Sequence, residues 1–203
     1  MEGSSRKEAS AGSRHSSGVE QFFVSINGQE NLNILDWAGV SQANVSIITG
    51  LGHRLYSDDF LQTMDTAAAD GGFASEEPNT SRADALIRQS LPFPPRHFDG
   101  LLIWDVLEYA PPGLLKPVID RLYEVSKPGA CLLALFHGDE KSGTVPVYHY
   151  RIADEKTLLL AQRERRRPVQ LFNNRALEKL FTRFQSIKFF LTRDSLREVI
   201  VKR

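Results

Sequence analysis

The stretch FDGLLIWDVLEY, residues 98–109, decides the fold of this chain together with the residues that follow it. It holds a continuous apolar run of strand length that ends at the polar Asp105, a pattern typical of a strand buried on both faces. Residues 113–125 then space their apolar side chains at helical intervals. The stretch KPGACLLALFH, residues 127–137, ends this helix with Pro-Gly and continues into a second apolar run. The order of strand, helix and strand predicts a βαβ unit whose two strands are parallel and joined right-handedly.

These stretches also resemble a known family. LPFP at residues 91–94, Phe98-Asp99, VLEY at 106–109 and VSKPGA at 125–130 follow one another in the order and spacing seen in class I S-adenosylmethionine-dependent methyltransferases. The resemblance implies an α/β fold with a Rossmann-like, doubly wound and mostly parallel seven-stranded sheet and an antiparallel C-terminal strand. It also implies S-adenosyl-L-methionine as the cofactor, and a methyl acceptor, either a small molecule or a protein, as the partner.

Size and composition predict one soluble domain. The chain has 203 residues, 41% of them hydrophobic, which is enough for one substantial core. Residues 1–18 contain no large apolar residue after Met1 and are expected to form a disordered tail, so the domain would span residues 19–203. We find neither a signal-peptide pattern nor an apolar stretch of the roughly 20 residues that a membrane helix needs. The prediction is a cytoplasmic protein with no membrane partner.

The charge balance and the metal-binding residue types exclude further classes. Lys and Arg together number 25, as do Asp and Glu, so no global charge favours nucleic acid or an anionic membrane. Cys131 is the single cysteine and lies in the second apolar run, which predicts an inert buried thiol. The five histidines are scattered without a ligand spacing, so no metal site is expected.

The loop after the first expected strand, residues 32–37, is where the resemblance places the cofactor. A doubly wound sheet binds its ligand at the carboxyl ends of its strands, closest to the first strand-to-helix turn. The family has the pattern D-x-G-x-G-x-G there, and this chain keeps the acid as Asp36. The three glycine positions hold Ala38, Val40 and Gln42, and Gly39 stands between them. The resemblance assigns cofactor contacts to Asp36, Ala38 and Gly39. Because Val40 is poorly suited to positive φ, either the loop follows a different path or the site is weakened.

Two acidic residues end the second expected strand, residues 53–56. In the family, an acid at this point holds the two ribose hydroxyls of the cofactor, because a carboxylate can accept two hydrogen bonds from a vicinal diol. Asp58 and Asp59 are both candidates for this cofactor contact. For either of them, the alternative of a helix N-cap before Phe60 is equally compatible with the sequence.

The remaining site residues follow from the positions of the later strands. Residues 60–82 are weakly patterned: Phe60, Leu61 and Met64 suggest a helical turn, and the segment is expected to form a surface loop or a lid. Residues 83–87 are expected to form the third strand. The resemblance then places Gln89 near the adenine ring, and Trp104 either stacks against the cofactor or fills the cleft. His137, at the carboxyl end of a strand, is the candidate catalytic base, with a purely structural histidine as the alternative. Glu108 is expected to be a charge on the side of a helix.

An insertion at residues 138–167 follows the second strand of the βαβ unit. Residues 145–152 and 157–162 predict a small β-hairpin, which in the family would form an arm that covers the substrate. Its residues Tyr148, His149 and Tyr150 can line a pocket or serve for packing alone. The cationic run RERRR at 163–167 is either a contact for an acidic ligand or a solvated turn.

The sequence leaves two functions open. The first is an S-adenosylmethionine-dependent methyltransferase that acts on an unidentified acceptor. The second is a methyltransferase-like pseudoenzyme, which serves as an interaction or regulatory module without cofactor turnover. The replaced glycines favour the second function, and the retained Asp36 with the pair Asp58 and Asp59 favours the first.

Overall fold

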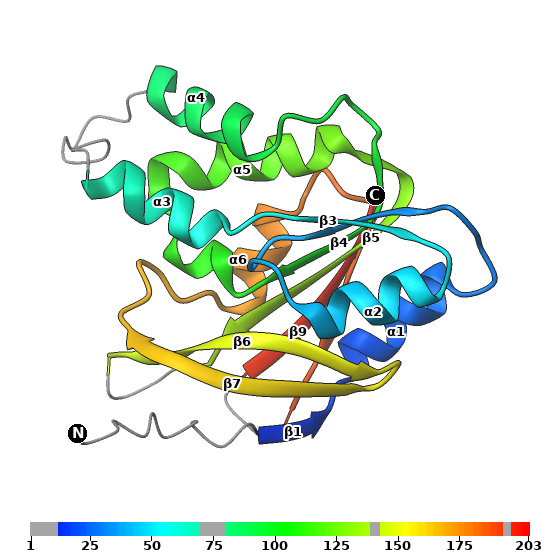
Figure 1. The fold of residues 1–203 in the computed structure, drawn as a ribbon. Helices are drawn as coiled ribbons and strands as arrows, with labels where there is room; N and C mark the ends of the chain where they lie inside the picture. The colour runs from blue at the N-terminus through cyan, green and yellow to red at the C-terminus, as the bar shows by residue number, and fades with distance from the viewer. Residues whose placement is uncertain (1–11, 70–79, 139–142, 193–195) are drawn as a thin grey trace, which may run out of the picture.

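The main sheet of the protein has six strands in the order β3-β2-β4-β5-β9-β8 (Figure 1). The structure, a computed structural model, describes residues 12–69, 80–138, 143–192 and 196–203. The strands are β2 (Asn33–Asp36), β3 (Arg54–Ser57), β4 (Phe98–Trp104), β5 (Ser126–His137), β8 (Ser186–Phe190) and β9 (Leu196–Lys202). The first four are parallel to one another, and β9 runs antiparallel to both β5 and β8. The predicted βαβ unit and the antiparallel C-terminal strand are therefore confirmed.

The expected third strand at residues 83–87 is wrong, and with it the count of seven strands. These residues belong to the helix α4 (Thr80–Ser90). Ala83, Leu86 and Ile87 are all buried, and their spacing places them on one face of a helix, where they pack into the core. The helical turn suggested by Phe60, Leu61 and Met64 is confirmed as the start of α3 (Phe60–Ala69), which is longer than one turn and replaces the expected loop up to Ala69. Residues 70–79 lie outside the described part of the chain.

Helices cover both faces of the main sheet, as Figure 1 shows. On one face, α3, α4, α5 (Pro112–Val125) and α6 (Asn174–Leu180) enclose the larger apolar cluster of the core. On the other face, α1 (Ser17–Ile26), α2 (Gln42–Gly50) and the hairpin described below enclose the second cluster. A single 3-10 turn, η1 (Val106–Tyr109), follows β4. This arrangement leaves the carboxyl ends of the parallel strands under loops and the hairpin rather than under a helix.

A separate three-stranded sheet lies against the second face. It consists of β1 (Gly12–His15), β6 (Val145–Asp154) and β7 (Thr157–Arg166) in the order β1-β7-β6. The predicted hairpin is thus confirmed, but the cationic run belongs mostly to β7 and is no solvated turn. The expected tail is wrong for residues 12–18, because β1 pairs with β7 and α1 begins at Ser17. Residues 1–11 lie outside the described part of the chain.

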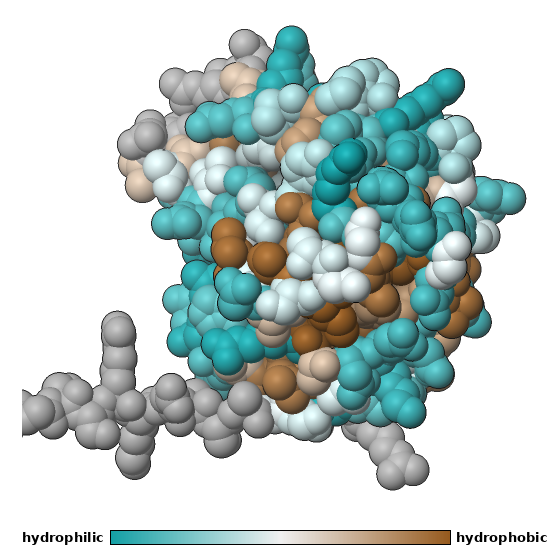
Figure 2. Space-filling view, turned by 45° about the vertical axis from the view of Figure 1, so that its right-hand side comes forward, coloured by the Kyte–Doolittle hydropathy of each residue, from teal (hydrophilic) through white to brown (hydrophobic). Residues whose placement is uncertain are grey.

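The surface of the face that carries α1 and α2 mixes apolar and hydrophilic side chains, and Figure 2 shows several apolar ones gathered there. Val24 on α1 and Val40 in the loop before α2 are among the exposed large hydrophobic residues. None of the helices within the described residues has the length and apolar character needed to cross a membrane.

Candidate functional site

A cavity of about 390 Å³ lies at the carboxyl end of β2. One wall is the loop 38–41 with the first two residues of α2, and the opposite wall is the segment 149–151 of β6. Asp36, the last residue of β2, also lines the cavity, although only 1% of its surface is exposed. The loop that the sequence assigned to cofactor binding therefore borders a cavity, and the hairpin closes its other side.

The loop achieves its sharp turn with a single glycine. Gly39 has a φ of 90°, a left-handed conformation that glycine adopts at low cost, and its N–H donates to the carbonyl of Asp58 over 3.0 Å. A Cβ atom at position 39 would lie only 3.2 Å from Oδ2 of Asp59. The side chain of Val40 points outward, with 80% of the residue exposed. The loop thus follows its own path, in which Gly39 provides both the positive φ and the close approach.

Asp36 is held by two side chains at its buried carboxylate. The indole Nε1 of Trp104 donates to Oδ1 over 2.7 Å, and Nδ2 of Asn44 donates to Oδ2 over 2.7 Å. Burial raises the pKa of Asp36, and the two hydrogen bonds oppose that rise because they stabilise the charged form. The carboxylate is consequently a fixed group at the base of the cavity.

Trp104 fills the space beside the cavity. Its backbone has a φ of 56°, and its indole is fully buried and stacks on the ring of Tyr150 with 4.8 Å between centroids and an interplanar angle of 1°. The second of the two predicted roles, filling the cleft, matches this position. Since its N–H binds Asp36, Trp104 connects the end of β4 to the end of β2.

Asp58 and Asp59, the two acids that follow β3, have different surroundings in the structure. Oδ1 of Asp59 accepts the backbone N–H of Gln62 over 3.0 Å, which makes Asp59 the N-cap of α3, and Oδ2 lies 3.7 Å from the guanidinium of Arg163. Oδ2 of Asp58 is buried and has no hydrogen-bond partner among the described residues. Burial raises the pKa of Asp58. Asp58 lies near the indole of Trp37 and is not among the residues that line the cavity, so its contact with a ligand hydroxyl stays a prediction.

Gln89 does not join this site. It is exposed near the end of α4 and lines a shallow pocket with residues of α3. The predicted contact with an adenine ring depended on a strand at residues 83–87, and the helix found there carries Gln89 away from the strand ends. The structure thus places Gln89 outside the cavity at β2, and its contact with an adenine ring stays a prediction.

A second polar cluster lies at the carboxyl ends of β4 and β5. His137 is 2% exposed, and its Nδ1 lies 2.6 Å from Oε2 of Glu108, while its backbone N–H donates to Oε1 of the same carboxylate over 2.7 Å. Glu108 is fully buried, in contrast to the expected charge on a helix side. Burial raises the pKa of Glu108 to about 7 and that of Asp105 to about 6. Three groups that can exchange protons near neutral pH are thus held together at the sheet edge.

Tyr150 lies between the two polar groups of residues. Its ring stacks on Trp104 beside the cavity, and its hydroxyl lies close to Asp105. Burial, followed by the charge of Asp105, raises the pKa of Tyr150, so that the phenol stays neutral. The hairpin therefore covers both the cavity at Asp36 and the cluster at His137.

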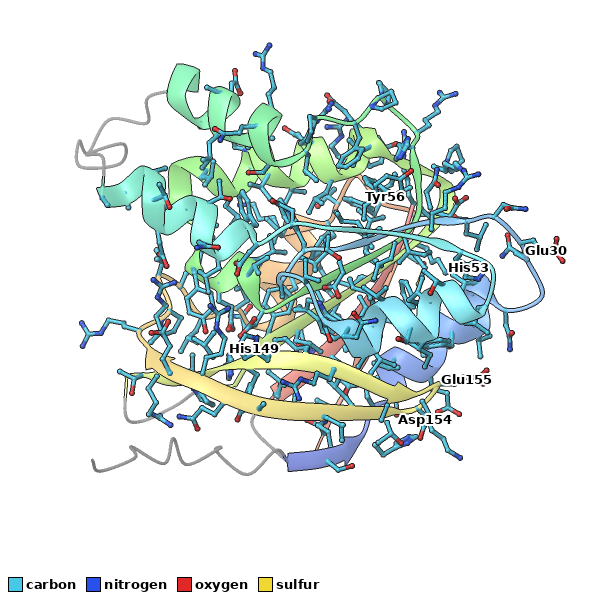
Figure 3. All side chains as sticks on the ribbon, in the orientation of Figure 1. Glu30, His53, Tyr56, His149, Asp154 and Glu155 are labelled. Atoms are coloured by element: carbon cyan, nitrogen blue, oxygen red, sulfur yellow. The ribbon has the colours of Figure 1, made fainter. Side chains whose placement is uncertain are left out.

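The hairpin adds positive charge to the rim of the cavity. His149 and Arg151 line it from β6, and Figure 3 shows His149 along β6, with Asp154 and Glu155 at the far tip of the hairpin. Burial and the neighbouring Arg163 and Arg151 lower the pKa of His149. At neutral pH the arginines supply the positive charge.

Sequence reasoning missed two residues of this site and misjudged the burial of a third. Asn44 carries no motif signal, because an Asn in a helix is usually exposed. Arg151 follows the Tyr-His-Tyr segment that the sequence did single out, so its alternation along β6 is the signal that places it at the rim. Glu108 was named, but its burial depends on the β4 to β5 contact and cannot be read from its neighbours. In the described part of the chain, no group of three or more His, Cys, Asp or Glu side chains could hold a metal ion.

Comparison with known proteins shows the fold. No family model matches the sequence, and no curated protein matches it. A solved structure of an S-adenosylmethionine-dependent methyltransferase from Methanosarcina mazei is similar, with 18% identity, a TM-score of 0.51, and coverage of 89% of this chain and 96% of that one. Another, from Archaeoglobus fulgidus, has 11% identity, a TM-score of 0.53 and 91% coverage of both chains. The cyclase SpnF has 13% identity, a TM-score of 0.51, and coverage of 91% of this chain and 79% of its own. The chain has the class I methyltransferase fold, which at these identities is shared by proteins of different activity.

Proposed function

We propose that this protein binds S-adenosylmethionine in the cavity between the loop 38–41 and β6, and transfers its methyl group to an acceptor not yet identified. The observation that carries the proposal is the arrangement of charge in that cavity. A fixed carboxylate, Asp36, lies at its base, and Arg151 lies at its rim. The two charges match a ligand with an amino-acid group, which presents an ammonium and a carboxylate together.

The position of the cavity supports the same ligand. It lies at the first strand-to-helix turn of a doubly wound sheet, where such folds bind nucleotide-type ligands. The N-terminus of α2 faces the cavity with Gln42 and Ala43, and this end of a helix favours negative charge. Asp58, whose carbonyl accepts the N–H of Gly39 in this loop, is the residue that would accept the ribose hydroxyls. The residues present thus fit the cofactor that the fold suggests.

The cluster at His137 supports chemistry on an acceptor that must lose a proton. When bound, S-adenosylmethionine supplies a methyl group on a positively charged sulfur, which an acceptor atom displaces in line. His137 would take the acceptor proton at Nε2, because Nδ1 is already paired with Glu108 at 2.6 Å. Glu108 holds the imidazole and stabilises its charged form. Tyr150 and the hairpin exclude water from this end of the sheet.

Calorimetric titration of the whole chain with S-adenosylmethionine and S-adenosylhomocysteine tests the proposal. We expect micromolar binding, a free energy of about −8 kcal/mol. Arg151→Gln and Asp58→Asn should each weaken it by about tenfold or more, since each removes one charged hydrogen-bond partner. Arg183→Gln is the matched control, because Arg183 pairs with Asp120 outside the cavity.

Two outcomes of this titration would contradict the proposal. Binding absent at millimolar ligand, or equal in Arg151→Gln, Asp58→Asn and the control, would overturn the proposed site. Absence of binding would also favour the alternative function, a methyltransferase fold that acts as an interaction or regulatory module. Variants of Asp36 are less informative, because its buried hydrogen bonds make it a residue of the core as well.

A further inference from the structure

Asn44 joins the base of the cavity to its hairpin wall. From a position on α2 that is 1% exposed, its Nδ2 donates to Oδ2 of Asp36 over 2.7 Å and to the carbonyl of Tyr150 over 3.1 Å. Its Oδ1 accepts the backbone N–H of Ile152 over 2.8 Å. One amide side chain therefore binds a carboxylate of β2 and two backbone groups of β6.

The two backbone groups that Asn44 binds lie on an edge of the hairpin, so this contact holds the hairpin in its position. In its sheet, β6 is the last strand of the order β1-β7-β6, so the edge of β6 toward α2 has no further strand to pair with among the described residues. Buried backbone groups need partners, and the side chain of Asn44 takes the place of the missing strand at positions 150 and 152. The segment 149–151 held in this way is the wall of the cavity opposite the loop.

We propose that Asn44 is a positioning residue that holds Asp36 and the β6 wall as one unit, so that ligand binding in the cavity and the order of the hairpin are coupled. The inference rests on the proposed function for the identity of the ligand. The tie between α2 and the hairpin, in contrast, is a property of the chain without ligand. A ligand that contacts both Asp36 and Arg151 stabilises the same arrangement of β2 and β6 that Asn44 maintains. Ligand binding and the order of the hairpin are coupled because both depend on this arrangement.

Only an amide satisfies all three partners. Asn44→Ala removes two donated bonds and one accepted bond. Asn44→Asp keeps the oxygen that accepts from Ile152, but it loses both donors and places a second carboxylate beside Asp36. The two variants therefore separate the tie to the hairpin from the environment of Asp36. Thr49→Ala is the matched control, because Thr49 is exposed on the same helix and its hydroxyl donates to the carbonyl of Val45, away from the cavity.

The first experiment measures amide hydrogen exchange of the ligand-free protein by NMR. We expect the Ile152 amide to exchange about tenfold faster in Asn44→Ala than in wild type, the effect of losing one buried hydrogen bond. Asn44→Asp and Thr49→Ala should retain the slow exchange. Equal exchange at Ile152 in Asn44→Ala and wild type would overturn the proposal.

The second experiment measures S-adenosylhomocysteine binding to the same proteins at pH 8 and pH 5. We expect Asn44→Asp to bind about tenfold or more weakly than wild type at pH 8, because two adjacent carboxylates cannot both be charged at low cost, and to approach wild type at pH 5. His149, Arg151 and Tyr150 face the same cavity in every variant, so the ratio to wild type at each pH removes their titration. A purely structural role for Asn44 would instead weaken binding equally at both pH values, and that result would overturn the coupling.

The two experiments distinguish this inference from the proposed function. If wild type does not bind S-adenosylhomocysteine, the proposed function fails, and the coupling to that ligand fails with it. The exchange at Ile152 still decides whether Asn44 ties the hairpin to α2. If wild type binds and the Asn44 variants bind equally well at both pH values, the coupling alone is overturned.

Discussion

The indole Nε1 of Trp104 lies 2.7 Å from Oδ1 of Asp36, and this bond joins the carboxyl ends of two neighbouring parallel strands. Both side chains are buried, so the bond compensates a carboxylate that water does not reach. The ring of Tyr150 stacks on the same indole. One pair of residues thus connects the loop of the cavity, the end of β4 and the hairpin.

Trp104→Phe is expected to destabilise the protein more than Trp37→Phe. Both residues are fully buried indoles that stack on another ring, and both substitutions remove similar volume. Trp104 donates over 2.7 Å to the carboxylate of Asp36, which is 1% exposed, whereas the indole of Trp37 lies near the less buried carboxyl of Asp58 without a hydrogen bond of standard geometry. The difference should be about 2 kcal/mol, the cost of leaving a buried acceptor unpaired. Urea unfolding of the two variants measures it, and equal midpoints with equal slopes would contradict the prediction.

Gly39→Ala is expected to cost more stability than Gly28→Ala. Both glycines have positive φ, 90° and 72°, so alanine meets a similar backbone cost of about 1–2 kcal/mol at each. At position 39 the new Cβ also approaches Oδ2 of Asp59 to 3.2 Å, whereas nothing lies within 4 Å of a Cβ at position 28. Thermal unfolding measures the difference. Binding of S-adenosylhomocysteine should be lost only in Gly39→Ala, and retained binding would show that the loop tolerates the shift.

The central part of the fold could be predicted from local pattern. Clear local patterns mark three segments: the apolar run before Asp105, the helical spacing at 113–125 and the apolar run that ends at His137. All three elements were confirmed. The predictions that were wrong, for residues 83–87 and 12–18, failed for a different reason. Residues 83–87 are short and apolar, a case in which strand and helix cannot be told apart by period alone, and packing against α5 decided for the helix. Residues 12–18 are ordered by partners distant in sequence.

The candidate site was predictable only at its loop. Asp36 and Gly39 were found because a strand-to-helix turn has a sequence pattern, and both line the cavity. The choice between Asp58 and Asp59 required the start of α3, which makes Asp59 its N-cap. Asn44 and Arg151 act through the contact of α2 with β6, between residues more than 100 positions apart. No pattern in one sequence encodes that contact.

Arg14→Ala is expected to destabilise the protein strongly, although it lies near the chain start. Its guanidinium lies 2.5 Å from Oε1 of Glu198, whose side chain is fully buried in β9. Removing the arginine leaves a buried carboxylate with less compensation, which costs about 3–5 kcal/mol. Arg183→Ala, which breaks an exposed pair with Asp120, should change stability by no more than about 1 kcal/mol. Unfolding by urea at pH 7 compares the two, and an equally small loss for both would contradict the prediction.

The last prediction concerns the buried carboxylate of Glu108 and the pH dependence of stability. Its pKa is raised from 4.5 to about 7 in the folded protein, chiefly by burial. Between these two values the folded state holds a proton that the unfolded state has released, so each rise in pH favours unfolding. The stabilisation is therefore present below about pH 4.5 and is lost as the pH rises to about 7.

Glu108→Gln removes this titration while it keeps the shape of the side chain. Relative to wild type, the variant should gain up to about 3 kcal/mol of stability between pH 4.5 and pH 8, because one pKa unit corresponds to about 1.4 kcal/mol. The measurement is the free energy of unfolding of both proteins at several pH values, with Glu178→Gln on the exposed side of α6 as the control. If the difference between Glu108→Gln and wild type stays constant over this range, Glu108 is charged in the folded protein throughout. A charged Glu108 would accept the Nδ1–H of His137, and Nε2 would then be the nitrogen that takes a proton from an acceptor.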